Sequence, residues 1–549
     1  MFIRIVQHKS AKKTYRHIQI VESYRDPEKG NSPRTRILYK LGSLEDLGEE
    51  QVVRLAAGLM KAIGKELTLP ELKNAKDFGH VYAVQAVWDA LGLSRALERA
   101  GISGKNNTDF CAMIRWLVFN RLCDPCSKLA LLDWTQSIFA PETADIAYHN
   151  LLRAMDRLIT IKDQAEPRIA QAVLDPKEPV DMVFYDITST YFEGDKSIQN
   201  GDVRRYGYSR DHREDRRQVT IGLVMTRSGI PLCHHVFPGN TLDKTTVAQV
   251  VSDLKSRFQL RRVIFVGDRG MLSDGNLTHL LEEGLDFIVA HPVRGNALAQ
   301  EVINTLKKQI NPVSEDEQFC EDAREGIRFI MAYSPEIAQQ SKESRQERLE
   351  KADAWIKPVL KRLAQPAGRG RKATPQGAYD QIRDYLRDHN LLRWYQVELA
   401  DETLSLKKNR KALNWEATVD GVLLLETSDM TIPPQDIVKH YKELAEVERG
   451  WRCLKSSLEL RPVYHWTERR IRAHIFICVI ALQMERWMRN KLQSLSVSKA
   501  MRVLRQIKVG ELCYGDRTEL MPTALTHEHK EILKKLGVTQ PTRAQLSGK

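Results

Sequence analysis

The sequence contains few cysteines, and they are scattered along the chain. Eight cysteines among 549 residues are too few for a disulfide framework and favour a reducing compartment. Cys123 and Cys126 form a CxxC pair, but a zinc site of the usual kind needs a second pair of ligands. Pro125, followed by Cys126 and Ser127, is more typical of a helix start. We therefore expect structural cysteines rather than a metal centre.

Long hydrophobic runs are also missing. The longest begins at Ile475 and has ten residues, whereas about 20 are needed to span a bilayer. A charged residue, Arg4, comes too early for a secretory signal peptide. We expect a cytoplasmic protein that does not enter the membrane.

Acidic residues are outnumbered by basic ones. The 71 Asp and Glu residues face 84 Lys and Arg, which gives a net charge of +13. This balance favours a polyanionic partner, and nucleic acid is the first to consider. The excess is modest for the length, so composition alone does not establish DNA binding. The length itself predicts about two to four domains.

Hydrophobic periodicity divides the first half of the chain into three segments. Residues 1–48 alternate apolar and polar positions with basic residues between them, which predicts a basic β-rich region that could contact DNA. Residues 49–178 show helical spacing and predict a helical domain. Residues 179–294 read as three strands, a helix, a strand, a helix and a strand. This order is typical of a mixed sheet with helices packed on it.

The second half begins with an interruption of this pattern. Residues 295–429 predict an insertion domain, with a long charged helix from Pro335 and, farther on, apolar strands with a hairpin turn at residues 420–421. Basic residues exceed acidic ones along that helix. Such a run is usually a solvated face, so DNA contact there is a secondary hypothesis. Helical spacing resumes over residues 430–494, and a partly helical, basic tail is expected at 495–549.

An aspartate lies inside a stretch that otherwise reads as a buried strand. Asp186 stands in the apolar stretch 183–194, although a lone buried carboxylate needs a partner or a metal. Asp268 follows another β-branched run, and strand ends of open sheets are where ligands bind. On neighbouring strands the two carboxylates would repel each other unless a cation such as Mg²⁺ lay between them. Two unrelated strand-end aspartates are common, so the pair alone does not establish a metal site.

A third carboxylate lies in a heptad of polar residues. Tyr441, Glu448 and Lys455 are seven residues apart, and a helix drifts only about 20° per heptad, so one continuous helix would carry all three on one face. A structural heptad would be apolar there, whereas a phenol and an ammonium suit phosphate oxygens. Glu446 is a rival carboxylate. Two residues along a helix turn it about 200° around the axis, so it should face elsewhere.

In this arrangement the chain resembles bacterial insertion-sequence transposases of the DDE type, in the branch with a Tyr-x2-Arg-x3-Glu-x6-Lys helix. Asp268 follows Asp186 by 82 residues, and Glu448 follows Asp268 by 180, a long gap similar to the β-rich insertion of that branch. Leu444 stands where the signature has Arg, so one basic contact is missing. Arg452, or less plausibly Lys442, could replace that contact.

The resemblance implies an α/β fold: a ribonuclease-H-like mixed sheet flanked by helices, interrupted by an α+β insertion, with an N-terminal basic β region and a helical domain. It implies DNA strand cleavage at transposon ends and strand transfer into target DNA, with two Mg²⁺ ions, for which Mn²⁺ can substitute, held by Asp186, Asp268 and Glu448. The side chains expected to contact DNA are Arg269, Tyr441, Trp451, Arg452 and Lys455. Trp451 could stack on a flipped base, although a core tryptophan is the more common reading.

The expected partners are the double-stranded DNA of transposon ends and target, together with further copies of the chain in a homodimer or higher synaptic assembly. A bacterial, nucleoid-associated location follows from the resemblance. A metal-dependent nuclease on the same fold is one alternative, although the basic N-terminal region and the insertion favour a transposase. A non-catalytic DNA-binding derivative is the other, and the three intact carboxylates argue against it.

Overall fold

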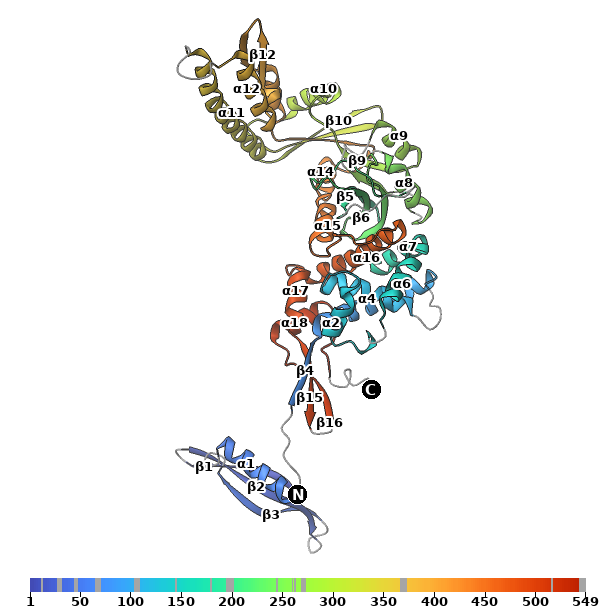
Figure 1. Ribbon diagram of the computed structural model, residues 1–549, viewed down its shortest axis with the longest axis vertical. Coiled ribbons are helices and arrows are strands. Elements are labelled where there is room, and N and C mark those ends of the chain that lie inside the picture. The colour runs from blue at the N-terminus through green and yellow to red at the C-terminus, as the bar shows by residue number, and fades with distance from the viewer. Residues whose placement is uncertain are drawn as a thin grey trace. The chain divides into compact units, whose positions relative to one another are not determined.

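The structure of the chain is a computed structural model (Figure 1). It describes residues 1–10, 13–26, 32–43, 48–64, 71–102, 109–143, 146–177, 180–193, 202–242, 245–258, 260, 263–267, 273–365, 373–514 and 517–542. The chain divides into two compact units. The first comprises Met1–Lys76, Lys508–Thr523 and Pro541–Lys549, and the second Asp77–Ile507 and Ala524–Gln540.

The first unit contains two three-stranded sheets and one helix. Strands β1 (Phe2–Ser10), β2 (Lys13–Asp26) and β3 (Ser32–Ser43) form an antiparallel sheet in that order. Helix α1 (Glu49–Ala62) follows, and β4 (Glu71–Asp77) joins β15 (Lys508–Tyr514) and β16 (Arg517–Pro522) in the order β16-β15-β4. The N-terminal β sheet is as predicted. The tail, expected to be partly helical, also forms strands, because β4 supplies a partner more than 400 residues away in the sequence.

Helices form one part of the second unit. They are α2 (Gly79–Ala90), α3 (Leu93–Arg99), α4 (Phe110–Cys123), α5 (Ala130–Ser137), η2 (Pro141–Thr143), α6 (Tyr148–Thr160), α7 (Lys162–Val173), α16 (Glu468–Leu492), α17 (Val497–Leu504) and α18 (His527–Lys535). Helix α16 packs against α4, α6 and α7, and its apolar middle is buried on all sides. Nowhere in the described residues does a helix have both the length and the apolarity to cross a membrane.

A mixed sheet of eight strands forms the centre of the second unit, in the order β10-β11-β14-β9-β8-β5-β6-β7 (Figure 1). Its first elements in the chain are β5 (Met182–Tyr191), β6 (Gln218–Thr226), β7 (Pro231–Pro238), α8 (Val247–Ser256), β8 (Ile264–Gly267), α9 (Asp274–Glu282) and β9 (Asp286–Ala290). Strand β5 is antiparallel to β6 and parallel to β8, and β8 is parallel to β9. The type and order of elements predicted for residues 179–294 are confirmed.

The segment after β9 extends this sheet and adds a second core. Strands β10 (Gln318–Arg324) and β11 (Ile327–Tyr333) form a hairpin, and β14 (Val422–Thr427) lies between β11 and β9. The other elements are α10 (Ala297–Leu306), η4 (Lys307–Gln309), α11 (Pro335–Ala364), α12 (Pro375–Asp388), η5 (Leu392–Trp394), β12 (Tyr395–Ala400), β13 (Thr403–Lys408) and α13 (Arg410–Val419). Helices α11 and α12 and strand β12 enclose a core of their own (Figure 1).

The hairpin predicted at Asp420 and Gly421 is wrong. The residues before this turn form helix α13, and strand β12 pairs with β13 instead. Gly421 has a φ of +69°, and a Cβ there would lie 2.3 Å from the Ser334 carbonyl oxygen. The dipeptide therefore permits a close approach to the start of α11, where Arg345 forms two hydrogen bonds of 2.6 Å to Asp420.

Candidate active site

Asp186 lies in the middle of β5. Tyr185 and Ile187 pack into the hydrophobic core with α8, so strand alternation turns Asp186 to the opposite face. Helix α15 (Ala445–Ser456) packs against β5. The Ile187 N–H donates a hydrogen bond of 2.7 Å to Asp186 Oδ1. The one acidic position in an otherwise uncharged strand thus presents a carboxylate beside a helix.

The surroundings of Asp186 disfavour its charged form. The pKa of Asp186 is raised to about 6, mainly by burial and in part by the negative charge of Glu448 on α15. The Ile187 N–H, the charge of Arg210 and the indole of Trp451 lower the pKa but do not outweigh burial. A buried carboxylate in this condition takes up a proton or a cation more readily than an exposed one.

The helix that carries Glu448 is interrupted just before it. The heptad prediction assumed one helix, but α14 (Pro434–Lys442) ends two residues before α15 begins. At the junction the Leu444 N–H bonds to the Tyr441 carbonyl, and the Val447 N–H to the Leu444 carbonyl, each at 3.0 Å. These bonds to the third preceding residue tighten the turn and change the register of Tyr441 relative to Glu448. The prediction of one continuous helix is wrong at this point.

Glu446 and Glu448 have different neighbours. Glu446 forms an ion pair with Arg449, and its carboxylate lies 3.6 Å from Arg486 and 3.7 Å from Arg489. Glu448 is exposed, and its charge acts on Asp186. The two side chains therefore face in different directions, as expected from their separation of two residues on a helix.

The remaining residues expected on this helix differ in exposure. Trp451 is buried, at 6 % exposure, whereas Arg452 is exposed. Lys455 donates a hydrogen bond of 3.1 Å to Asp211, and Arg461 reaches the same carboxylate at 2.7 Å. Burial lowers the pKa of Lys455 and Asp211 opposes this effect. Lys455 is thus neutralised by an internal partner.

Asp268 and Arg269 lie outside the described residues. The strands that precede the two aspartates are nevertheless neighbours. Gly267, the last residue of β8, is paired with Tyr185, the residue before Asp186. The neighbouring-strand arrangement of β5 and β8 predicted from the sequence is confirmed.

An arginine-rich segment between β5 and β6 was not predicted to take part. Arg213 and Arg461 both lie over the ring of Tyr191, with guanidinium carbons 5.0 and 5.1 Å from its centroid. The Arg210 backbone N–H donates a hydrogen bond of 3.1 Å to a serine hydroxyl of β5. The sequence signal was present, since six arginines fall within residues 204–217. This segment places cations along the strand that carries Asp186.

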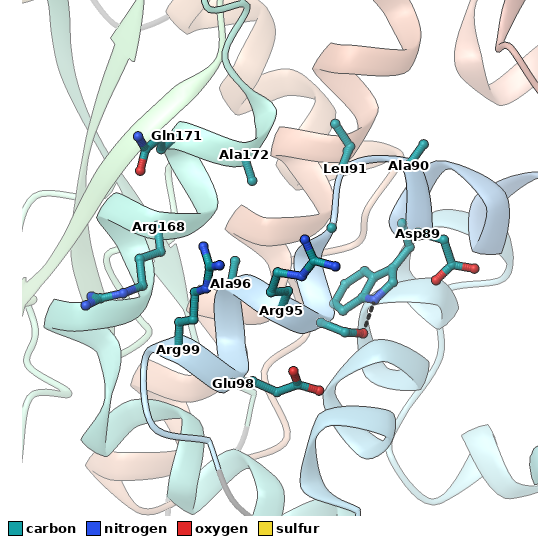
Figure 2. A pocket seen from close by; sticks show the side chains of 13 residues that line it. Asp89, Ala90, Leu91, Arg95, Ala96, Glu98, Arg99, Arg168, Gln171 and Ala172 are labelled. Carbon is teal, nitrogen blue, oxygen red and sulfur yellow. Dashed lines mark hydrogen bonds between the residues drawn. The ribbon is translucent and has the colours of Figure 1, made fainter.

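A separate cavity of about 710 Å³ lies beside α3 and α7, and the residues expected to act do not line it. Figure 2 shows Arg95, Arg99 and Arg168 around this cavity, together with the hydrogen bond of 2.8 Å from the Trp88 indole to Ser94. Among the residues that the structure describes, no group of three or more His, Cys, Asp or Glu side chains could hold a metal ion.

Comparison with known proteins identifies the class. Residues 184–484 match the family model described as "Transposase DDE domain", and residues 3–70 match "IS1634 family transposase, N-terminal domain". The first match covers more than half of the chain, from β5 to α16. It is the domain of a phosphoryl-transfer enzyme that catalyses transposition. The chain belongs to the DDE transposases, and its N-terminal segment is similar to the N-terminal domain of IS1634 family transposases.

No curated protein matches the chain significantly. Among solved structures, a similar chain is that of the piggyBac transposase synaptic complex with hairpin DNA. It is 10% identical, with a TM-score of 0.37 over 85% of this chain and 82% of that one.

The predictions of a DDE transposase and of its ribonuclease-H-like α/β fold are confirmed. The DDE domain also implies DNA binding and divalent metal ions.

Proposed function

We propose that Asp186, Asp268 and Glu448 are the catalytic carboxylates of this transposase and hold two divalent ions, Mg²⁺ or Mn²⁺. One observation carries the proposal: the pKa of Asp186, inside a buried strand, is raised to about 6 by burial, next to the negative charge of Glu448. The charge of Arg210 also acts on Asp186, but burial still keeps the pKa of this carboxylate raised. Mutually repelling oxygen donors fit a hard divalent ion.

Each described side chain has a separate task in this proposal. The Ile187 N–H fixes one oxygen of Asp186, which orients the carboxylate for a ligand. Glu448 offers its carboxylate from the facing helix, and the buried Trp451 ring limits access of water from the protein side. Bound divalent ions supply charge stabilisation for the attacking and leaving oxygens of the phosphodiester, so no side-chain nucleophile is needed.

Phosphate contacts are proposed for the basic and phenolic side chains around this site: Arg269, Tyr441, Arg452 and Lys455. Lys455 would exchange Asp211 for a DNA phosphate, since both groups present oxygen acceptors to the same ammonium. Leu444, at the Arg position of the Tyr-Arg-Glu-Lys branch, lies at the junction of α14 and α15. Base stacking is not assigned to Trp451, because its ring is buried.

The proposed substrates are the ends of the mobile element and its target DNA, joined in a bacterial cytoplasm by a homodimer or larger synaptic assembly. The basic strands β1–β3 would recognise the ends. Deletion of residues 1–48 should then weaken binding to end DNA and remove the preference for end over unrelated sequence. Equal affinity and preference in the truncated protein would refute this role.

The catalytic assignment is tested by strand cleavage of DNA that carries the element's ends, in the presence of Mg²⁺. The native protein should cut at the ends and join them to target DNA. Asp186→Asn and Glu448→Gln should bind the ends without cutting them, because each removes a metal ligand. Glu446→Gln is the matched control, two residues away on the same helix, and should still cut.

The outcomes separate the alternatives. Loss of cutting in Glu446→Gln with activity retained in Glu448→Gln would assign the third carboxylate to Glu446. Cutting by the native protein without any joined product would indicate a nuclease on the same fold.

A further inference from the structure

A second basic site lies beyond the catalytic helix. The loop between α15 and α16 meets α4 and the residues after it around a cavity of about 50 Å³. Arg121, Lys128, His465 and His474 line this cavity, and all four side chains are buried. Tyr464, which also lines the cavity, is 62% exposed, so the cavity lies close to the surface.

Lys128 has hydrogen-bonding capacity left over. Its ammonium lies 2.6 Å from His474 Nδ1, and His474 Nε2 lies 2.9 Å from the Leu460 carbonyl oxygen. A carbonyl only accepts, so Nε2 carries the proton and Nδ1 accepts from Lys128. An ammonium has three N–H donors, and two remain for a ligand. The buried His465 Nε2 also has no hydrogen-bond partner among the described residues.

Glu459 also lines the cavity, but its side chain is exposed and forms no ion pair with Lys128 or Arg121 among the described residues. Arg121 donates to the Glu459 carbonyl at 3.1 Å and to Asn120 Oδ1 at 2.9 Å, so its partners are neutral groups. Within the described ranges no carboxylate forms an ion pair with Lys128. The pKa of Lys128 is lowered to about 7, mainly by burial and in part by the charge of Arg121. A buried cation without a counter-ion is unfavourable, and an anion would remove the penalty.

We propose that this cavity binds a phosphate of the DNA backbone next to the catalytic site. The two remaining N–H donors of Lys128 and the positive charge of Arg121 suit an anion with several oxygen acceptors. The volume of the cavity exceeds what one water requires and is too small for a base. The same loop carries Arg461, which shares Asp211 with Lys455, so the loop that lines the cavity is joined to α15 through this carboxylate. The inference rests on the action of this transposase on DNA.

The test is the salt dependence of DNA binding by the full-length protein. Lys128→Met keeps the length of the side chain and removes its charge. The loss of one phosphate contact should weaken binding severalfold, equally for end and unrelated sequences, and reduce the slope of log affinity against log salt by about 0.9. Lys255→Met is the matched control, because Lys255 is already paired with Glu283 at 2.5 Å. It should leave the slope unchanged.

Three further measurements keep the test decisive. The urea midpoint of Lys128→Met should equal or exceed that of the native protein, since an unpaired buried charge is removed. His465→Gln should weaken binding in the same direction without a change of charge. An unchanged salt slope in Lys128→Met would overturn the proposal. If inorganic phosphate stabilises the native protein but Lys128→Met keeps the native salt slope of DNA binding, the cavity is a site for free phosphate and not for DNA. The catalytic assignment of Asp186 and Glu448 is tested by DNA cleavage and not by DNA binding. Its outcome is therefore independent of the outcome for this cavity.

Discussion

Asp186 and Glu166 are both carboxylates in the interior of the second unit, but their surroundings carry opposite charge. Glu166, on α7, lies 2.7 Å from Lys162, 2.6 Å from His234 and 2.5 Å from Arg257. Burial alone would raise its pKa, yet these cations hold the pKa well below its usual range. The pKa of Asp186 is raised to about 6, mainly by burial and also by the charge of Glu448, and the charge of Arg210 does not offset this.

The difference in surrounding charge distinguishes Glu166, whose carboxylate stabilises the fold, from Asp186, whose carboxylate we propose as a metal ligand. The partners of Glu166 come from α7, β7 and α8, so its charge joins the helical part of the unit to the edge of the sheet. Its oxygens are fully used and cannot serve a ligand. The carboxylate of Asp186 lies between β5 and α15, and its charge is disfavoured there. A bound cation would stabilise the charged form of this carboxylate.

The largest expected effect is on catalysis. Asp186→Asn should reduce end cleavage by more than about 10³-fold, equivalent to about 4 kcal/mol of transition-state stabilisation, because the amide is a poor metal ligand. At pH 7 and without metal, the same change should raise the free energy of unfolding by about 1–3 kcal/mol, since the charge of a group with a raised pKa opposes folding. Cleavage assays and urea unfolding in chelator measure the two effects. Lower stability in Asp186→Asn would contradict the comparison.

Glu166→Gln should have the opposite profile. It leaves Lys162, His234 and Arg257 without their shared counter-ion, and the free energy of unfolding should fall by about 3–5 kcal/mol. Cleavage per folded molecule should be retained at low temperature. Glu283→Gln, at an exposed pair with Lys255, is the control and should unfold like the native protein. A catalytic defect in folded Glu166→Gln would remove the distinction drawn between the two carboxylates.

Stability should decrease in acid, in two stages. Burial lowers the pKa of His80 to about 4 and that of His235 to about 3, so the unfolded state binds more protons below pH 6.5 and stability falls as the pH falls. The depressed pKa of Glu166 adds a further loss below pH 4.5. Because protonation of Asp186 has the opposite effect in this range, urea midpoints are measured from pH 7.5 to 4 in the Asp186→Asn background. They should show both stages there, and addition of Glu166→Gln should remove the second. A midpoint independent of pH between 6.5 and 5 would argue against buried neutral histidines.

The smallest expected effect concerns Lys455 on α15 and Arg461 in the following loop, which share Asp211. Asp211→Asn should free Lys455 and Arg461 for phosphates, so DNA affinity should rise severalfold and the salt slope should steepen by about 1 to 2. The measurement is DNA binding over a range of salt concentrations. The same substitution in a Lys455→Met background should give a smaller gain. An equal gain in both backgrounds would exclude Lys455 from the DNA contact.

Much of the fold was predictable because local periodicity follows backbone geometry. The alternation in β5 and the element order over residues 179–294 identified the sheet, and Asp186 was conspicuous as a polar residue in an apolar strand. The break before α15 was not predictable in this way. Leu444 and its neighbours are ordinary helix residues, and the tightened turn is visible only in the hydrogen bonds of the structure.

The sequence by itself determined the class of this protein. The motifs around Asp186, Asp268 and Glu448 resemble those of DDE transposases, and the match of residues 184–484 to the DDE domain confirms this class. Only the tertiary structure decided which acidic and basic groups are already paired. Glu446 with its arginines, Lys455 with Asp211 and Glu166 with its cations are pairs between separate elements. Electrostatic interaction depends on distance and burial in space, which the order of residues along the chain does not specify.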